Sequence, residues 1–325
     1  MAAGRFRVFA SVFPILLAIP VLRADVTLRY KTEVTMNPNL PAQMAGAMAG
    51  AMKGPGSAAP RESVVRLKGG KGFYTAAGFN SIADFTTQEI TLLDASTARY
   101  AKLNAGQVGK EMADAMPKMP AEASAAMASM KTDVTPARAT GRTAVIQGVE
   151  TEEREIVVSI TGPAMPNMPP GPMVRMVMQL WTAKPGEILR VPAIRELTGY
   201  SLWSFATMNP AAGIEAIMKQ MPGLSDVFEP IMNATQKGTT MMRMHTELFM
   251  PMMAAMLQLM PAAGNTGGAS FDPDAPLMQM NLEAVELSTE PVPDSVFLIP
   301  EGYQEAVASD VIKGVFAKIQ APAKQ

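Results

Sequence analysis

The sequence predicts an α+β protein in which mainly antiparallel strands are interrupted by inserted helices. Three observations support this class. Residues 26–36 alternate strictly between apolar and polar side chains, short strand-like segments recur between turn residues, and several intervening segments carry apolar residues at helical spacing. Strands and helices do not alternate regularly, as they would in a βαβ fold. The chain has 325 residues, which is enough to bury a substantial core.

Residues 1–24 have the features of a secretory signal peptide. Two arginines precede the apolar stretch VFASVFPILLAIPVL, and the tripeptide LRA ends it with a small residue at the cleavage position. The alternative is an uncleaved N-terminal anchor, although the stretch is short for a membrane-spanning helix and two prolines interrupt it. No Cys follows it, so we expect a periplasmic or secreted protein without a lipid-modified cysteine. No other segment is long and charge-free enough to span a bilayer, so we expect no further transmembrane span.

The composition excludes several classes of function. Cleavage of the signal peptide lowers the number of basic residues from 28 to 25, against 29 acidic residues, so we expect no nucleic-acid partner. The chain has no Cys, which excludes disulfides, thiol catalysis and thiolate metal sites. It has 29 Met, whose unbranched and polarizable side chains favour an adaptable apolar core or groove.

The first strand covers DVTLRYKTEVTM, in which Val26, Leu28 and Tyr30 share one face. A first Met-rich insertion follows at about 40–60. Further strand-like segments are separated by turn residues, which is typical of an antiparallel meander. They are RESVVRLKGG (61–70), KGFYTAAG (71–78), ITLLDAS (90–96) and ARYAKLN (98–104).

The second half of the chain continues this pattern. A Met-rich insertion at about 105–131 has apolar residues three and four positions apart, which predicts an amphipathic helix that prolines bend or split. A third insertion lies at about 250–275. The other expected elements are a hairpin over 142–162 with its turn at Gly148, a strand over 173–183, helices over 191–232, strands over 239–250 and 276–290, and a final helix over 304–319.

The only histidine of the chain lies in the methionine-rich strand segment TTMMRMHTELFM. In a strand, Met242 and Met244 share one face, whereas His245 lies on the other face with Arg243 and Glu247. A copper ion would need an imidazole and thioethers that converge on one point. The alternation therefore favours an exposed histidine that is paired with a neighbouring charge.

The apolar faces of two strands form a candidate wall for a hydrophobic ligand. Methionine side chains repack at low energetic cost and therefore suit a surface that accepts irregular apolar partners. The alternative is that methionine replaces leucine in an ordinary core. The candidate residues are Met176, Met178, Leu180, Met242, Met244 and Leu248.

Motifs of the common enzyme classes are missing from the sequence. It contains no G-x-S-x-G elbow, no P-loop and no G-x-G-x-x-G segment after a strand. A single histidine allows neither a histidine–carboxylate constellation nor a plausible zinc site. We therefore expect a protein that is not an enzyme and uses no metal or other cofactor.

Three segments carry a resemblance to a known family: VPDSVFLIPEGYQEA (292–306), TGRTAVIQGVETEEREIVV (140–158) and QLWTAK (179–184). With them, the chain resembles bacterial exported proteins of the lipoprotein-carrier (LolA/LppX-like) fold, and within these an uncharacterised periplasmic branch. The resemblance implies one domain over residues 25–325, built as an open, strongly curved half-barrel wrapped around helices. It also implies a hydrophobic ligand such as an acyl chain.

Three functions follow from these observations. The first is an exported binding protein that holds a lipid, another hydrophobic molecule or an apolar protein segment. The second is Cu(I) binding in the cell envelope, since thioethers select this ion. Its candidate ligands are Met165, Met168, Met173, the methionines of Met241–Met260 and His245. The third is a structural or interaction module whose methionine patches dock another envelope protein.

Overall fold

A computed structural model describes most of the region expected to fold. None of its described helices has the length and apolar character needed to cross a bilayer. The expected signal peptide and most of the insertions at about 40–60 and 250–275 lie outside the described residues, whereas more than half of the insertion at about 105–131 is described and begins with a helix over Ala105–Ala115. The described residues are 24–40, 61–76, 79–115, 125, 129–163, 171–207, 239–252, 272 and 274–320.

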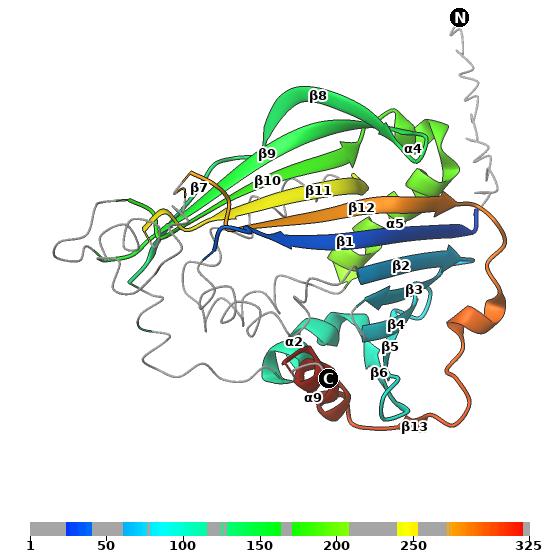
Figure 1. The fold of residues 1–325 in the computed structure, drawn as a ribbon. Helices are drawn as coiled ribbons and strands as arrows, with labels where there is room; N and C mark the ends of the chain where they lie inside the picture. Colours follow the sequence, from blue (N-terminus) through cyan, green and yellow to red (C-terminus); the bar gives the residue numbers. More distant parts are fainter. Residues whose placement is uncertain are drawn as a thin grey trace, which may run out of the picture.

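The described part of the chain contains thirteen strands and a small number of helices (Figure 1). The strands are β1 (Val26–Met36), β2 (Arg61–Lys68), β3 (Lys71–Ala76), β4 (Phe79–Asp84), β5 (Glu89–Asp94), β6 (Arg99–Asn104), β7 (Lys131–Val134), β8 (Arg138–Ile146), β9 (Val149–Thr161), β10 (Val174–Ala183), β11 (Met241–Phe249), β12 (Met278–Ser288) and β13 (Gln304–Glu305). The helices are α2 (Ala105–Ala115), α4 (Glu187–Arg190), α5 (Pro192–Thr207), α9 (Ala308–Gln320) and a short 3₁₀ helix, Asp294–Phe297.

All thirteen strands belong to one open sheet. Its spatial order is β13-β6-β5-β4-β3-β2-β1-β12-β11-β10-β9-β7, and β8 also pairs with β9. The pairing of β13 with β6 is parallel and all other pairings in the described residues are antiparallel. The expected α+β class, with a curved, mainly antiparallel open sheet and inserted helices, is therefore confirmed.

Strands β1 to β6 form the expected meander, and polar residues stabilise turns between its strands. Asp84 Oδ1 accepts hydrogen bonds from the backbone N–H groups of Thr86 and Thr87 at 2.9 and 3.0 Å, which closes the β4–β5 turn. The sequence did not predict β4. This strand is covered on both faces, because Ile82 and Ala83 pack into different clusters, so its sequence lacks a clear apolar–polar alternation.

Strand β1 lies at the middle of the sheet and joins its two halves. It pairs with β2 on one side and with β12 on the other, so the N-terminal meander continues directly into β12, β11, β10 and β9. The expected hairpin over 142–162 is confirmed as β8 and β9, and Gly148 has the positive φ of +75° that its turn requires.

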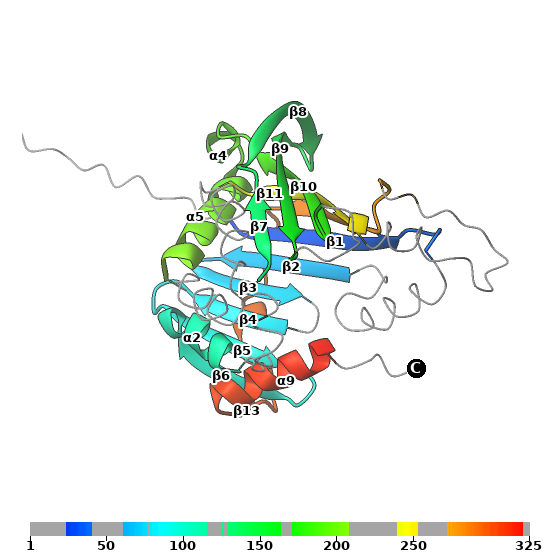
Figure 2. The same cartoon turned by 90° about the vertical axis from the view of Figure 1, so that its left-hand side faces the viewer.

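Helices cover one face of the meander. Helices α2 and α9 pack together and against β5 and β6, as Figure 2 shows, and they bury residues such as Leu92 and Val108. Helix α5 packs through Ile194 and Leu197 on a cluster that includes Val26 of β1. The opposite face of β3 to β6 is covered by the chain around the 3₁₀ helix.

The final helix begins later than expected. The prediction that it covers 304–319 is wrong at its N-terminal end, because Gln304 and Glu305 form β13. The Gln304 N–H donates a hydrogen bond to the Ala98 carbonyl at 2.9 Å, and the Ala306 N–H donates to the Tyr100 carbonyl at 2.8 Å. A strand of two residues has too little alternation to be recognised from sequence. Of the helices expected over 191–232, α5 is present and residues 208–232 lie outside the described part.

Candidate functional site

The face of five neighbouring strands carries an almost unbroken apolar surface. Residues that lie directly opposite one another in an antiparallel pair point to the same side of the sheet. The register of β1, β12, β11, β10 and β9 places Val34, Met280, Thr246, Met178 and Ile156 side by side. Four of these five side chains are apolar, although they come from strands far apart in the sequence.

The rows on either side of this central row have the same character. We call the apolar residues of the three rows, together, the methionine-rich wall. One flanking row contains Met36, Met278, Leu248, Met176 and Val158, and the other contains Leu282, Met244 and Leu180 between Thr32 and Arg154.

Burial along the methionine-rich wall is graded from one end to the other. Ile156, Val158 and Leu180 are at most 2% exposed and form a packed cluster with Met178. The wall residues on β11, β12 and β1 are only partly buried, and they include Met280. The wall therefore has a solid end at β9 and β10 and an accessible end at β11, β12 and β1.

The structure places five of the six predicted wall residues on this surface. The sixth, Met242, is completely buried and packs in the cluster beneath α5 with Val26 and Ile194. A β-bulge lies beside it, because Trp181 pairs with Arg243 whereas the next β10 residue pairs with Met241. Met242 is therefore enclosed among core residues. For the other five, a ligand-contacting role stays a prediction.

Sequence reasoning missed the contribution of β12 and β1 to the wall. Met278, Met280 and Leu282 recur at every second position of β12, and Val34 and Met36 do the same in β1. The same alternation that identified Met176 and Met178 would have identified these residues. Which strands lie next to one another, however, depends on the topology and cannot be read from the alternation.

The other face of the same strands is mostly polar, although Val177 and Phe249 are buried on it. His245 lies there, with Nδ1 at 2.6 Å from Asn281 Oδ1 and Nε2 at 3.4 Å from Glu247 Oε1. Arg243 forms an ion pair with Glu283 and places its guanidinium 5.7 Å from the centre of the Trp181 ring. The expected contact of His245 with a neighbouring charge is confirmed, but the histidine is half-buried rather than exposed. Its imidazole points away from the sulfur atoms of the wall.

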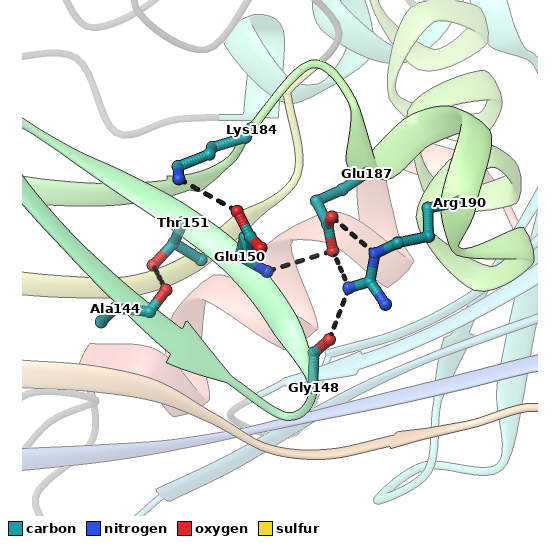
Figure 3. A network of polar contacts seen from close by, with 7 residues as sticks. All are labelled: Ala144, Gly148, Glu150, Thr151, Lys184, Glu187 and Arg190. Atoms are coloured by element: carbon teal, nitrogen blue, oxygen red, sulfur yellow. Dashed lines mark hydrogen bonds and ion pairs between the residues drawn. The ribbon is translucent and has the colours of Figure 1, made fainter.

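A polar network fastens the β8–β9 hairpin to helix α4 (Figure 3). The buried Glu187 carboxylate accepts a hydrogen bond from Arg190 Nε at 2.7 Å and one from the Glu150 backbone N–H at 3.1 Å. Arg190 also donates from Nη2 to the Gly148 carbonyl at 2.8 Å. The hydrogen bond from Arg190 holds the pKa of Glu187 below its usual range. This carboxylate therefore stays ionised and serves as a structural link.

Two tyrosines, Tyr30 and Tyr200, pack against the core cluster beneath α5. The Tyr30 hydroxyl donates a 2.6 Å hydrogen bond to the Met241 carbonyl, so a side chain of β1 reaches the backbone of β11. Tyr200 lies in a group of aromatic rings with Phe85 and Trp203, and burial raises its pKa to about 12. These neutral hydroxyls belong to the packed core.

The described residues provide no arrangement that suits metal binding by polar ligands. No group of three or more His, Asp or Glu side chains in these parts of the chain is placed to hold a metal ion. Of the methionines considered for Cu(I), Met165, Met168 and those beyond Met252 lie outside the described residues. The methionine-rich wall is the feature that most clearly distinguishes this sheet.

Comparison with known proteins assigns no family. No protein-family model matches the chain, and no curated protein matches it in sequence. Among solved structures, the chain is similar to PNGF-II crystallised in the C2 space group, with a TM-score of 0.31 and 8% sequence identity. The similarity covers 91% of this chain and 33% of PNGF-II, so the chain spans about a third of that protein. A similarity this weak indicates neither a shared fold nor a shared activity.

Proposed function

We propose that the chain is an exported, non-enzymatic binding protein that holds a hydrophobic ligand with an acyl chain on the methionine-rich wall. The observation that carries this proposal is the set of three mostly apolar rows on five neighbouring strands, whose apolar residues remain partly exposed on β11, β12 and β1. Large accessible apolar surfaces on a soluble protein usually mark a place where a partner or ligand binds.

The dimensions of the accessible part of the wall suit a segment of an extended acyl chain. Adjacent strands lie about 4.8 Å apart, so the accessible part of a row, across β11, β12 and β1, spans about 10 Å. Each methylene group removed from water contributes about 0.8 kcal/mol, so a chain that covers such a row gains substantial binding energy. Methionine side chains adjust to irregular apolar shapes and therefore allow chains of different length or unsaturation to bind.

Two features of the sequence support the same proposal. The N-terminal segment has the features of a signal peptide, which fits a protein of the periplasm or the extracellular space. The resemblance to lipoprotein-carrier proteins implies a curved open sheet that commonly holds acyl chains. An envelope protein segment is the alternative apolar ligand, and the experiment below also tests it.

A fluorescent fatty acid titrated into the delipidated protein tests the proposal. Val34 belongs to the central row of the wall, whereas its neighbour Thr35 is exposed on the opposite face of β1. We expect Val34→Glu to weaken binding at least tenfold, because the acyl chain would bury the new charge. Thr35→Glu is the matched control and should bind like the wild type.

Equal affinities of Val34→Glu and Thr35→Glu would contradict the proposal. Far-UV circular dichroism of Val34→Glu separates loss of binding from loss of folding, and Met280→Leu is a conservative variant that nearly conserves volume in the same row. It should fold and bind the fatty acid. If the wild type and all three variants fold but none binds the fatty acid, the result would favour a wall that binds an envelope protein.

A further inference from the structure

A second site lies on the face of the sheet opposite the methionine-rich wall. A pocket of about 380 Å³ is formed where the chain after the 3₁₀ helix crosses β3, β4, β5 and β6. Ile82 and Thr91, which are paired across β4 and β5, line it, and Lys102 continues their row on β6. Its volume lies within the range of about 300–1,000 Å³ that is usual for small-molecule sites.

One side of the pocket is apolar and comes from a distant part of the chain. Phe297, Leu298 and Ile299 line it, and Leu298 remains 60% exposed. The segment before them is fastened to the sheet, since Lys68 forms an ion pair with Asp294 at 2.8 Å and donates a hydrogen bond to the Val292 carbonyl at 2.7 Å. The apolar side of the pocket is therefore held in place.

The opposite side carries charges of both signs. In the strand register, Lys71 of β3 lies opposite Asp84 of β4, and Asp84 lies opposite Glu89 of β5. Glu89 lies 3.4 Å from Lys102. In the part of the chain that the structure describes, no ion pair involves Lys71. Two ammonium groups and two carboxylates thus line a pocket that also has an apolar surface.

We infer that this pocket binds a small zwitterion with an apolar side group, the chemistry of a free apolar α-amino acid. The ligand carboxylate pairs with the Lys71 ammonium, and the ligand ammonium pairs with the carboxylates of Asp84 and Glu89. The apolar side group lies against Ile82 and Leu298. Charges of both signs suit a ligand that also carries both and has no net charge. The site is independent of the acyl-chain site, because it lies on the other face of the sheet.

Isothermal titration of the full chain tests this inference with L-leucine as the probe. Two analogues separate the contributions of its charges: 4-methylpentanoate lacks the ammonium group, and 3-methylbutylamine lacks the carboxylate. We expect L-leucine to bind and each analogue to bind at least about tenfold more weakly, since each loses charge-assisted hydrogen bonds. Glycine, which lacks the apolar side group, should also bind more weakly.

Substitutions test the residues. Lys71 is exposed, so Lys71→Gln preserves the fold while it removes the ammonium group, and it should weaken L-leucine binding at least about tenfold. Lys131→Gln is the matched control, because Lys131 is an exposed lysine on β7 at the other end of the sheet. Leu298→Ser should also weaken binding.

Three results would overturn the inference. The first is no heat of binding with L-leucine at millimolar concentration. The second is equal binding of L-leucine and 4-methylpentanoate, because the ammonium group would then not be recognised. The third is equal binding by Lys71→Gln and Lys131→Gln. None of these results affects the acyl-chain proposal, which concerns the opposite face.

Discussion

Replacement of Glu187 by alanine removes the side chain that joins α4 to the β8–β9 hairpin. This carboxylate accepts hydrogen bonds from Arg190 and from the Glu150 backbone N–H, and the Glu187 side chain is only 6% exposed. A hydrogen bond to a charged group contributes about 1.5–3 kcal/mol. Arg190 is 56% exposed, however, so water screens much of its attraction. We therefore expect Glu187→Ala to lower the free energy of unfolding by about 2 kcal/mol.

A neighbouring carboxylate in the same network provides the control. Glu150 forms an ion pair with Lys184 at 3.0 Å, but both side chains are more than a third exposed. Exposed pairs contribute little, so Glu150→Ala should cost about 0.5 kcal/mol or less. Urea unfolding followed by the fluorescence of Trp181 and Trp203 measures both variants.

The pH dependence of the same difference tests its cause. The pKa of Glu187 is lowered in the folded protein. Its stabilisation is therefore complete above the pKa of an unfolded glutamate, about 4.3, and is lost as the pH falls through the lower folded-state pKa. The difference between wild type and Glu187→Ala should be constant from about pH 8 to pH 5 and should shrink below about pH 4.

Either of two results would refute this reasoning. One is a destabilisation by Glu187→Ala no larger than that by Glu150→Ala. The other is a difference in the free energy of unfolding that stays unchanged down to about pH 3, because the ionised carboxylate would then not be its source.

Two further substitutions test the packing of the sheet. Leu180→Ala, at the packed end of the methionine-rich wall, should lower the free energy of unfolding by about 2–5 kcal/mol. Its control is Leu202→Ala at an exposed position of α5, which should lower it by less than about 0.5 kcal/mol. Urea unfolding measures both. Gly314→Ala places a Cβ 2.9 Å from Asp94 Oδ2 and should push α9 from β5. Relative to the wild type, amide exchange in the variant should become faster in α9 but not in β9 to β12. Exchange in α9 that is unchanged from the wild type would contradict this.

Alternation predicted the strands that bury one face. Val26 to Met36, the hairpin around Gly148 and the strand containing Met176 were all predicted close to their observed bounds. Strand β4 was missed because helices cover one of its faces and the 3₁₀ segment covers the other, which removes the polar face that alternation detects. The two residues of β13 are too few to form a pattern.

The candidate sites depended on topology more than on pattern. The wall was predicted from two strands, but its accessible part also needs Met280 and Val34, and only the sheet order brings these beside Thr246. The bulge at Met241 and Met242 has no signature in the sequence. The pocket beside Leu298 was not predicted, because four strands and a segment about two hundred residues away build it together.

The central position of β1 has a consequence for how the chain acquires its fold. This strand is the first of the described strands to leave the ribosome, yet one of its two neighbours is β12, with Thr27 opposite Ser288 and Met36 opposite Met278. The sheet cannot be completed until nearly the whole polypeptide has emerged. Pairings between such distant segments give a high contact order and slow folding. The two halves of the sheet can therefore join at β1 only late in synthesis, after β12 has emerged.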